Sequence, residues 1–420
     1  MRKKKIWLLK LGEVLPIDGE DIRLQRTGML AKELHKNGFD VTWWTSTVNH
    51  VNKEQRFMED TEVEICEGYR IKLIYSNLYK KNVSLSRIRH YKEVSEKFLK
   101  MANRMEKPDL IITCLPIINL SKNAILYKKN NNVPVILDIR DLWPDVFLDL
   151  FPNSLKSFAR FLLKPLFKDV ELICSKATAI VGISPLFVKW AKDKLEQPDH
   201  NEFKCFPLGY YSHNILKERD TQNESKLWDQ YKLDEKFIIC FFGNFGRQFD
   251  FNTVIEAAKI LHISHPDIRF VLCGNGDNHL KYQQKAQDCP NIIFPGWINA
   301  SDIRTLMDMS KIGLAPYKNT VNFQLNLPNK PIEYMSAGLP ILSSIDGYLK
   351  TILQDHNMGV TYEDRNPESL ANHVSNLYKN RDLLGEMSKN TREIFKSHYS
   401  SEKIYKEYVS YIEGLINNKN

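Results

Sequence analysis

The sequence lacks three features, each of which would point to a particular class of protein. None of its apolar runs approaches the roughly 18 residues that a membrane-spanning helix needs. Its seven cysteines include no C-x-x-C pair, which suits reduced thiols in a cytoplasm and argues against a metal site built from them. No D-x-D tripeptide occurs and no metal-ligand cluster is present in the sequence, so we expect no metal centre.

The composition is that of an ordinary globular protein, with 43% apolar and 26% charged residues. A length of 420 residues exceeds one average core and predicts two domains. Lys and Arg number 59 against 51 Asp and Glu, and this mildly basic balance fits an anionic membrane surface, phosphorylated substrates or nucleic acid. Because no nucleic-acid-binding motif is present, we expect no nucleic-acid partner.

The start of the chain, MRKKKIWLLKLG, combines basic residues with an apolar run, as signal peptides do. Lys10 interrupts that run, which is already too short, and no small-residue cleavage site follows. We therefore expect a first β-strand here.

Short apolar runs alternate with helical patterns along the chain, which predicts an α/β fold with parallel sheets. The alternation stops in the polar run 212–224 and restarts at Lys236, so we place a domain boundary near residue 210. The expected elements are a helix at 22–37 and strands at 6–11, 39–45, 62–75 (as a hairpin), 109–114, 135–140, 179–183, 237–242, 269–273, 291–294, 312–316 and 340–344.

The stretch 326–344, NLPNKPIEYMSAGLPILSS, predicts a short helix followed by a buried strand. Asn329 can cap the free amides, Pro331 suits the first turn, and Gly338 suits the exit. The start of such a helix presents N–H groups that can bind a diphosphate. Glu333, one turn in, could accept hydrogen bonds from the vicinal hydroxyls of a ribose. Phosphate and ribose together indicate a nucleotide, although Glu333 could instead be a first-turn acid favoured by the helix dipole.

The run P-N-K-P-I-E-Y-M-S-A-G-L-P resembles the donor-binding helix of the retaining GT-B glycosyltransferases of family 4, and the likeness extends over nearly the whole chain. It is similar to a branch involved in bacterial surface-polysaccharide assembly. The family signature has two Glu residues separated by seven positions. Glu333 matches the second, which binds the ribose, whereas the first would fall at Leu325, so the contacts to the donor sugar stay open.

The resemblance implies two Rossmann-like domains that face each other across a cleft. The first, residues 1–209, would bind the acceptor and be completed by the C-terminal helix within about 398–420. The second, residues 210–397, would bind the nucleotide-sugar donor.

The segment Gly243-Asn244-Phe245-Gly246-Arg247 follows a predicted strand. Its glycines let backbone amides approach phosphate oxygens, and Arg247 offers a planar, permanently charged fork. Similar transferases bind the donor diphosphate at this place, and many of them have a Lys a few residues later. This chain lacks that Lys, so Arg247 would carry the charge largely alone or with Lys330. The resemblance also assigns Trp297 and Ile298 to the nucleotide base. The predicted donor-binding residues are Gly243, Asn244, Gly246, Arg247, Gly274, Trp297, Ile298, Leu327, Asn329, Lys330 and Glu333.

A second charged segment, D-I-R-D-L-W-P-D, begins at Asp138 within the strand 135–140. Charges at the carboxyl end of a parallel strand line the crevice in which open α/β sheets bind ligands. The alternative is that Arg140 pairs structurally with neighbouring acids. The resemblance places this loop, and the one after the first strand, toward the acceptor. The predicted acceptor-side residues are Gly12, Glu13, Arg140 and Trp143, and the predicted catalytic residues are Asp141, for acceptor contact or proton handling, and Arg247.

Two segments mix basic and apolar residues. LKSFARFLLKPLFK, at 155–168, contains no acid and could lie on an anionic membrane or dock onto its own domain. Residues 79–100 predict either a solvated amphipathic helix or an acceptor- or membrane-facing one.

The expected activity is the metal-independent transfer, with retention, of a sugar from a nucleotide donor, which we expect to be UDP-linked. The expected acceptor is a lipid-diphosphate-linked saccharide of capsule, O-antigen or exopolysaccharide assembly. We expect a cytoplasmic protein, peripheral on the inner face of the cell membrane, with no cofactor. The alternatives are a GT-B-type UDP-sugar 2-epimerase, which needs paired acid–base groups, and a non-catalytic membrane-associated scaffold.

Overall fold

The chain forms two compact units in a computed structural model that describes residues 2–19, 22–81, 84–196, 202–212 and 226–417. The first unit comprises Met1–Pro207 and Ile404–Asn420, and the second comprises Leu208–Lys403. We expected the first unit to end at residue 209 and to resume at about residue 398. In the structure it ends two residues earlier and resumes six residues later.

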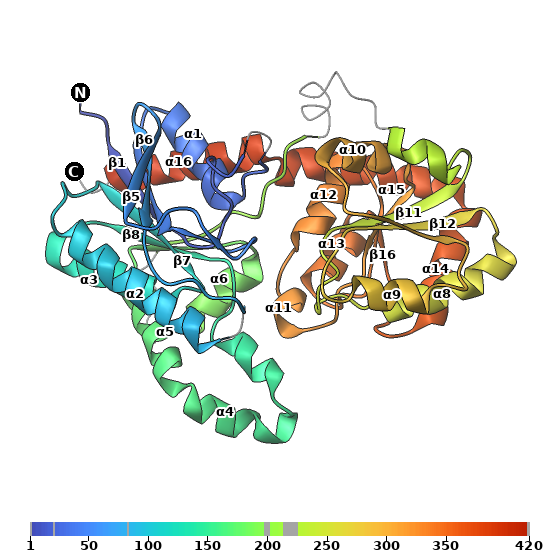
Figure 1. Cartoon of the computed structure of the whole chain (residues 1–420), viewed down its shortest axis with the longest axis horizontal. Helices are drawn as coiled ribbons and strands as arrows, with labels where there is room; N and C mark the ends of the chain where they lie inside the picture. The colour runs from blue at the N-terminus through green and yellow to red at the C-terminus, as the bar shows by residue number, and fades with distance from the viewer. Residues whose placement is uncertain (1, 20–21, 82–83, 197–201, 213–225, 418–420) are drawn as a thin grey trace. The chain divides into compact units, whose positions relative to one another are not determined.

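The first unit is built on an eight-stranded sheet in the order β10-β9-β8-β7-β1-β2-β6-β5 (Figure 1). All neighbours are parallel except β5 and β6, which form the expected hairpin. β1 pairs with β2 on one side and with β7 on the other, so the strand order reverses there. The strands are β1 (Lys5–Leu9), β2 (Asp40–Ser46), β5 (Thr61–Cys66), β6 (Tyr69–Ile74), β7 (Leu110–Leu115), β8 (Val135–Ile139), β9 (Ala179–Gly182) and β10 (Glu202–Cys205), with a small antiparallel pair of β3 (Val48–Asn49) and β4 (Glu54–Gln55).

Helices cover both faces of this sheet (Figure 1). α2 and α3 pack together and α5 packs on α3, whereas α1 meets the C-terminal helix α16, where Arg26 lies 5.4 Å from the ring centre of Tyr408. The helices are α1 (Arg26–Lys36), α2 (Leu85–Ala102), α3 (Ile118–Asn131), α4 (Lys156–Leu162), α5 (Lys164–Lys176), α6 (Pro185–Lys192) and α16 (Ser401–Asn417), with short 3-10 turns η1 (Asp145–Leu150) and η2 (Asn153–Leu155).

Two predictions for these helices were wrong in detail. The first helix begins at Arg26 rather than at residue 22. The segment 155–168 is not one helix, because α4 ends at Leu162 and α5 begins at Lys164, with Pro165 in its first turn. A proline suits that position because it has no N–H to donate within the helix.

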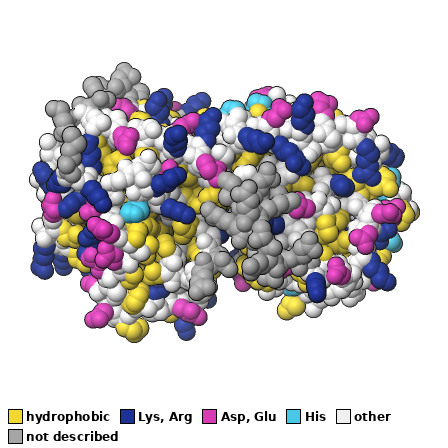
Figure 2. All heavy atoms as spheres, turned by 90° about the horizontal axis from the view of Figure 1, so that it is seen from above, with side chains coloured by type: hydrophobic (Ala, Val, Ile, Leu, Met, Phe, Trp, Pro, Cys, Tyr) yellow, Lys and Arg dark blue, Asp and Glu magenta, His cyan; other side chains and the backbone are white. Residues whose placement is uncertain are grey.

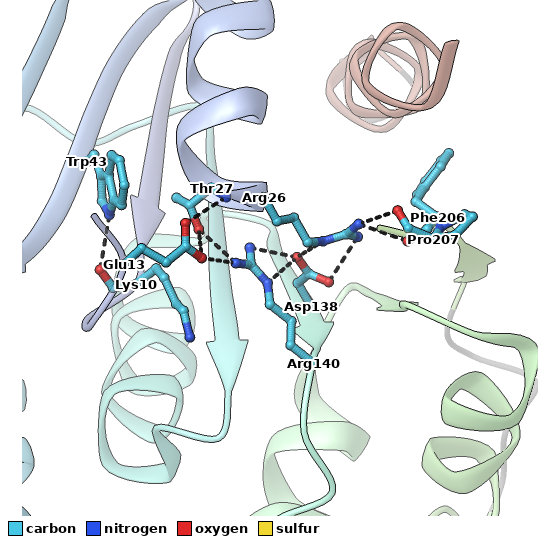
Figure 3. Close-up of polar contacts among 9 residues, drawn as sticks. All are labelled: Lys10, Glu13, Arg26, Thr27, Trp43, Asp138, Arg140, Phe206 and Pro207. Atoms are coloured by element: carbon cyan, nitrogen blue, oxygen red, sulfur yellow. Dashed lines mark hydrogen bonds and ion pairs between the residues drawn. The ribbon is translucent and has the colours of Figure 1, made fainter. Parts of the chain in front are cut away.

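A buried ion-pair network holds the carboxyl edge of the first sheet (Figure 3). Asp138, the fourth residue of β8, is fully buried and accepts from Arg26 Nε and from Arg140 Nε, each at 2.9 Å. Arg140 also pairs with Glu13, whose carboxylate accepts from the Thr27 amide at 3.0 Å. Burial alone would raise the Asp138 pKa, but the two guanidiniums hold it below its usual value.

Arg26 extends the network to the segment that leaves the first unit. Its Nη1 donates to the carbonyl oxygens of Phe206 and Pro207, both at 2.8 Å. The Phe206 ring stacks on Tyr408 of α16, with ring centres 4.4 Å apart. One buried guanidinium therefore joins β8, α1 and the last residues of the unit before the crossing.

The second unit has a six-stranded parallel sheet in the order β13-β12-β11-β14-β15-β16 (Figure 1). Numbered within the unit, this is the order 3-2-1-4-5-6 of mononucleotide-binding α/β folds, whose ligands bind where the order reverses, here between β11 and β14. The strands are β11 (Phe237–Phe242), β12 (Ile268–Cys273), β13 (Ile292–Gly296), β14 (Ile312–Ala315), β15 (Ile341–Ser343) and β16 (Gly359–Thr361).

The helices of the second unit surround this sheet. They are α8 (Phe251–Ser264), α9 (His279–Lys285), α10 (Ala300–Met309), α11 (Val321–Gln324), α12 (Asn329–Ala337), α13 (Tyr348–Asp355), α14 (Pro367–Lys379) and α15 (Arg381–Ile394), with a 3-10 turn η4 (Lys226–Tyr231) and a π-helical turn η5 (Phe395–Tyr399). On the face drawn in Figure 2, basic and acidic side chains are interspersed over both units. Within the described residues, every helix is too short or too polar to cross a bilayer.

Replacement of Asp138 by Asn tests the buried network. The variant keeps the side-chain shape but leaves two buried guanidiniums without their shared carboxylate. We expect the free energy of unfolding of the first unit to fall by about 3–5 kcal/mol, measured by urea titration. Glu106→Gln is the matched control, because Glu106 pairs with Arg2 and Lys5 while more than half exposed, and it should change nothing resolvable. Equal effects of the two variants would contradict the assigned role of Asp138.

Candidate functional site

Three loops of the second unit are joined by backbone hydrogen bonds at the carboxyl edge of its sheet. The Gly243 amide, after β11, donates to Cys273 O at 2.9 Å. The Gly274 amide, after β12, donates to Gly296 O at 2.6 Å, and the Phe245 amide donates to Asn275 O at 2.8 Å. The predicted residues Gly243 and Gly274 are therefore neighbours, beside the point where the strand order reverses.

Glycine is required at position 274 of this junction. Gly274 has φ +134, and a Cβ there would lie 1.7 Å from Gly243 O. Gly276 is also closely covered, since a Cβ there would lie 2.3 Å from Asn244 Oδ1. The two loops therefore touch backbone to backbone, and the amides of the G-N-F-G-R segment lie at the edge of the sheet.

Aromatic rings anchor the G-N-F-G-R loop from beneath. Phe245 and Phe249 are buried and lie 5.7 and 5.0 Å from the ring of Phe241 in β11. Arg247, between the two anchors, is exposed, and its guanidinium has no hydrogen bond or ion pair among the residues that the structure describes. The loop thus presents a permanent positive charge to solvent from a fixed backbone.

Helix α12 begins differently from the prediction. Asn329 was expected to cap it, but Asn329 is its exposed first residue and Pro328 occupies the cap position. Pro328 and Pro331 have no N–H, and the Lys330 amide is hydrogen-bonded to Tyr317, so the Asn329 amide is the first-turn amide that remains available to an anion. Leu327 is buried just before the helix. The exit is as predicted, because Gly338 has φ +74 in the left-handed region.

Lys330 joins α12 to the glycine loop. Its Nζ donates to the carbonyl oxygen of Phe242 and lies 5.0 and 5.1 Å from the ring centres of Phe241 and Phe242. A Cβ on Gly243 would lie 2.5 Å from Lys330 Nζ. The start of α12 and the glycine loop are therefore in contact, although Lys330 and Gly243 are 87 positions apart in the sequence. Both segments were predicted to bind a diphosphate.

Glu333 is the fifth residue of α12 and is 4% exposed. It lies beyond the first turn, so the alternative of a first-turn acid favoured by the helix dipole is wrong. Burial raises the pKa of Tyr317, and the nearby Glu333 charge raises it further. Tyr334, the next residue, donates to Leu314 O at 2.9 Å and so fixes α12 on β14. A carboxylate buried in this way is costly unless it is held by polar groups.

The two residues assigned to the nucleotide base differ in exposure. Trp297, directly after β13, is 71% exposed, so the alternative that it is plain core is wrong. Ile298 is buried. An indole ring left this open to solvent is available for a flat, apolar ligand surface.

The predicted acceptor-side residues of the first unit divide into two groups. Glu13 and Arg140 pair with each other and with the network around Asp138, which is the structural alternative left open by the sequence. Gly12 has φ +81 and lies beside His50, which a Cβ would meet at 3.6 Å. Trp143 is half-buried, with its ring 4.5 Å from Phe147.

Asp141 lies after the end of β8. Its Oδ1 accepts from the Leu142 amide at 2.9 Å, and burial raises the pKa of its carboxyl. Lys10 and Arg87 lie close enough to oppose that rise. Lys10 was assigned no role from the sequence, where its only signal was a charge that interrupts the first apolar run. Arg87 lies in the segment 79–100, for which an acceptor- or membrane-facing role was one of the two alternatives.

The described residues contain no group of three or more His, Cys, Asp or Glu side chains arranged to hold a metal ion. The positive groups of the second-unit site are Arg247, Lys330 and the Asn329 amide at the start of α12.

Residues 223–394 match the family model described as "Glycosyl transferases group 1". The matched region contains the glycine loop, Arg247, Lys330 and Glu333. For these residues of the second unit, the match agrees with the prediction of a glycosyltransferase.

Two curated relatives are similar in sequence. TuaH of Bacillus subtilis, a glycosyltransferase named for teichuronic acid biosynthesis, is 29% identical over 114 residues, which is 26% of this chain and 27% of its own length. The match therefore spans about a quarter of that relative. Alpha-monoglucosyldiacylglycerol synthase of Acholeplasma laidlawii is 22% identical over 314 residues, 72% of this chain and 74% of its own.

Solved structures show the fold. Sucrose-phosphate synthase from Thermosynechococcus elongatus aligns over 99% of this chain and 100% of its own, at 16% identity and a TM-score of 0.70. HepE of Anabaena, solved with UDP, aligns over 98% and 100%, at 13% identity and a TM-score of 0.65. A protein described as a UDP-N-acetylglucosamine 2-epimerase from Listeria monocytogenes aligns over 100% and 98%, at 12% identity and 0.60. The predicted GT-B fold is confirmed.

Substitution of Gly274 by Ala tests the backbone junction. The new Cβ would collide with Gly243 O, so the loops after β11 and β12 must separate. We expect a lower melting temperature, measured by differential scanning fluorimetry. Gly385→Ala is the control, because nothing lies within 4 Å of a Cβ there, and that helical site should tolerate or gain from alanine. A Gly274→Ala variant as stable as the wild type would show that the junction is not rigid.

Proposed function

We propose that this chain, whose residues 223–394 match the group 1 glycosyltransferases, is a retaining transferase of family 4 that uses a UDP-linked sugar. The observation that carries the proposal is the contact of Lys330 with the glycine loop, together with the buried Glu333 on the same helix. One segment offers amides and charge for a diphosphate, and the other offers a carboxylate for a ribose.

In this proposal, the diphosphate lies against the loop amides of Asn244, Gly246 and Arg247, because those of Gly243 and Phe245 already donate to Cys273 and Asn275. The Asn329 amide at the start of α12 adds a further donor. Arg247 and Lys330 neutralise the negative charge that grows on the diphosphate as the sugar leaves. Fixed protein charges would then do what a divalent ion does in other transferases, and no metal cofactor is needed. Turnover in excess EDTA should equal turnover in Mg²⁺, and loss of activity on chelation would contradict metal independence.

The acceptor in this proposal is a lipid-diphosphate-linked saccharide of capsule, O-antigen or exopolysaccharide assembly, bound by the first unit. The naming of TuaH for teichuronic acid biosynthesis supports a role in a surface polymer. Asp141 is the proposed group for acceptor contact or proton handling, because its raised pKa favours the protonated form more than in a free carboxyl.

A lipid-linked acceptor requires a membrane-facing surface, and we propose that α4 provides it on the inner face of the cell membrane. Four apolar side chains beside or within α4 are largely exposed, namely Leu155 (49%), Phe158 (60%), Phe161 (69%) and Leu162 (57%). They therefore do not dock on their own unit, although Phe167 in α5 is buried and does. Arg160, Lys164 and Lys168, all exposed, add attraction to anionic lipid.

A GT-B-type UDP-sugar 2-epimerase is the second candidate, because an epimerase-like protein shares the fold. It would use the same donor site but convert UDP-N-acetylglucosamine without any acceptor. Incubation of the protein with that sugar nucleotide alone separates the two: an epimeric product supports the epimerase, and its absence supports a transferase. A non-catalytic scaffold would bind no nucleotide, which a thermal shift with UDP tests.

Substitutions at Glu333 and Arg247 test the donor site. Glu333→Gln removes the carboxylate proposed for the ribose, and Arg247→Ala removes the exposed guanidinium proposed for the diphosphate. Each should weaken the binding of UDP by about 10- to 100-fold, measured by isothermal titration calorimetry, because a hydrogen bond to a charged group contributes about 1.5–3 kcal/mol.

Lys389→Ala is the control for both, since it removes one exposed positive charge from α15. It should leave UDP affinity unchanged. Wild-type affinity in both Glu333→Gln and Arg247→Ala, with the fold retained, would remove the donor-site assignment.

Replacement of Phe158 and Phe161 by Ser tests the membrane surface. Full burial of such a side chain is worth about 1.5–3 kcal/mol, so the double variant should bind phosphatidylglycerol vesicles at least about tenfold more weakly in a flotation assay. Ile263→Ser, at an exposed apolar position of the second unit, should bind like the wild type. Vesicle binding that survives the double substitution would exclude α4 as the anchor.

A further inference from the structure

Four basic side chains gather at the carboxyl edge of the first sheet, where its strand order reverses between β1 and β7. Lys10 directly follows β1, His50 directly follows β3, Lys53 lies in the turn between β3 and β4, and Arg87 is in the first turn of α2. These four residues form what we call the basic cluster. The reversal point is where open α/β sheets bind their ligands.

Three members of the basic cluster, His50, Lys53 and Arg87, meet around the buried ring of Tyr79. Lys53 Nζ lies 3.2 Å from His50 Nδ1, which in turn lies 2.6 Å from Tyr79 Oη. Lys53 Nζ and Arg87 Cζ lie 5.3 and 5.9 Å from the centre of the Tyr79 ring. Arg87 also donates to Tyr91 Oη at 2.7 Å, which fixes the position of its guanidinium.

Burial and the neighbouring positive charges lower the pKa of two members of the basic cluster. Burial, and then the charges of Lys53, Arg87 and Lys10, lower the pKa of His50 to about 4. Burial and Arg87 lower the pKa of Lys53. Like charges held together in this way are a cost to the folded protein unless an anion joins them.

Two acids of the first unit have partners outside the basic cluster. Glu13 is bound by Arg140 and the Thr27 amide, and Glu93 accepts from Ser76 at 2.6 Å. Asp141 is the carboxylate that faces Lys10 and Arg87, and its pKa is raised by burial.

Lys10 is the member of the basic cluster that packing does not explain. Arg87 and Lys53 lie over aromatic rings, a contact that could be purely structural. The ammonium of Lys10, half-exposed at the end of β1, makes no hydrogen bond or ion pair within the described part of the chain. A lysine placed there without a protein partner is available to a ligand.

We propose that the basic cluster binds the phosphate groups of the acceptor, with the fork of Arg87 and the ammonium groups of Lys10 and Lys53 on phosphate oxygens. Phosphate is the ligand class that a guanidinium and two ammonium groups suit, and the phenol of Tyr79 can add a hydrogen bond. The proposal deepens the proposed function and rests on it, because it assigns the acceptor's diphosphate to named residues. It moves the acceptor contacts away from Glu13 and Arg140 to the basic cluster, in which Arg87 belongs to the segment 79–100 that the sequence left open to an acceptor-facing role.

Inorganic pyrophosphate is the probe, titrated calorimetrically into the full chain in the presence of saturating UDP. UDP occupies the diphosphate position of the second unit, so the remaining binding reports the first. Lys10→Gln and Arg87→Gln should each weaken this binding about tenfold, as expected for loss of one charge-assisted contact. Arg89→Gln, exposed on the same helix, should have no effect, and Lys10→Arg should restore most of the affinity.

Wild-type affinity in Lys10→Gln would overturn the proposal, as would the absence of any pyrophosphate binding with UDP present. If Arg87→Gln fails to fold, Lys10→Gln decides between the outcomes, because the Lys10 ammonium makes no hydrogen bond or ion pair within the described residues. If the protein binds no UDP, the proposed function fails separately. The same titration in an Arg247→Ala/Lys330→Gln background then still tests the basic cluster.

Discussion

The contact of two backbones at Gly243 and Gly274 is the constraint on which the second-unit site depends. Because the carbonyl of Gly243 occupies the place of a Cβ on Gly274, the loops after β11 and β12 are locked together. The glycine loop is then held from beneath by Phe245 and Phe249 and from the side by Lys330. A binding surface made of backbone amides needs such rigidity, since amides must be in place before the anion arrives.

The first unit uses the same kind of sheet edge in another way. There, Asp138 forms ion pairs with the buried guanidiniums of Arg26 and Arg140, and Arg140 also forms an ion pair with Glu13. With these charges paired internally, the groups left at the reversal point are Asp141, Lys10 and the rest of the basic cluster. In our proposals, the two units would supply positive charge for two different phosphates, the second unit by amides with Arg247 and Lys330, and the first unit by side chains alone.

Local features of the sequence predicted local structure well. The six residues of β11 were predicted without error, and Gly338 ends α12 as its left-handed preference requires. Features that depend on distant residues were not predictable. The pairing of Arg140 with Glu13 spans 127 positions, and the basic cluster joins elements from residue 10 to residue 87, so no local pattern signals either. Two further differences occur beside prolines. Pro165 lies in the first turn of α5, where the segment 155–168 divides into two helices, and Pro328 occupies the cap position that Asn329 was expected to fill.

The most direct test of the central claim is hydrogen–deuterium exchange of the full chain with and without UDP. The account predicts slower exchange in two separate segments of the second unit, residues 243–247 and 328–335, and no change in residues 6–20 of the first. Protection confined to other segments, or no protection at a UDP concentration that saturates binding, would contradict it.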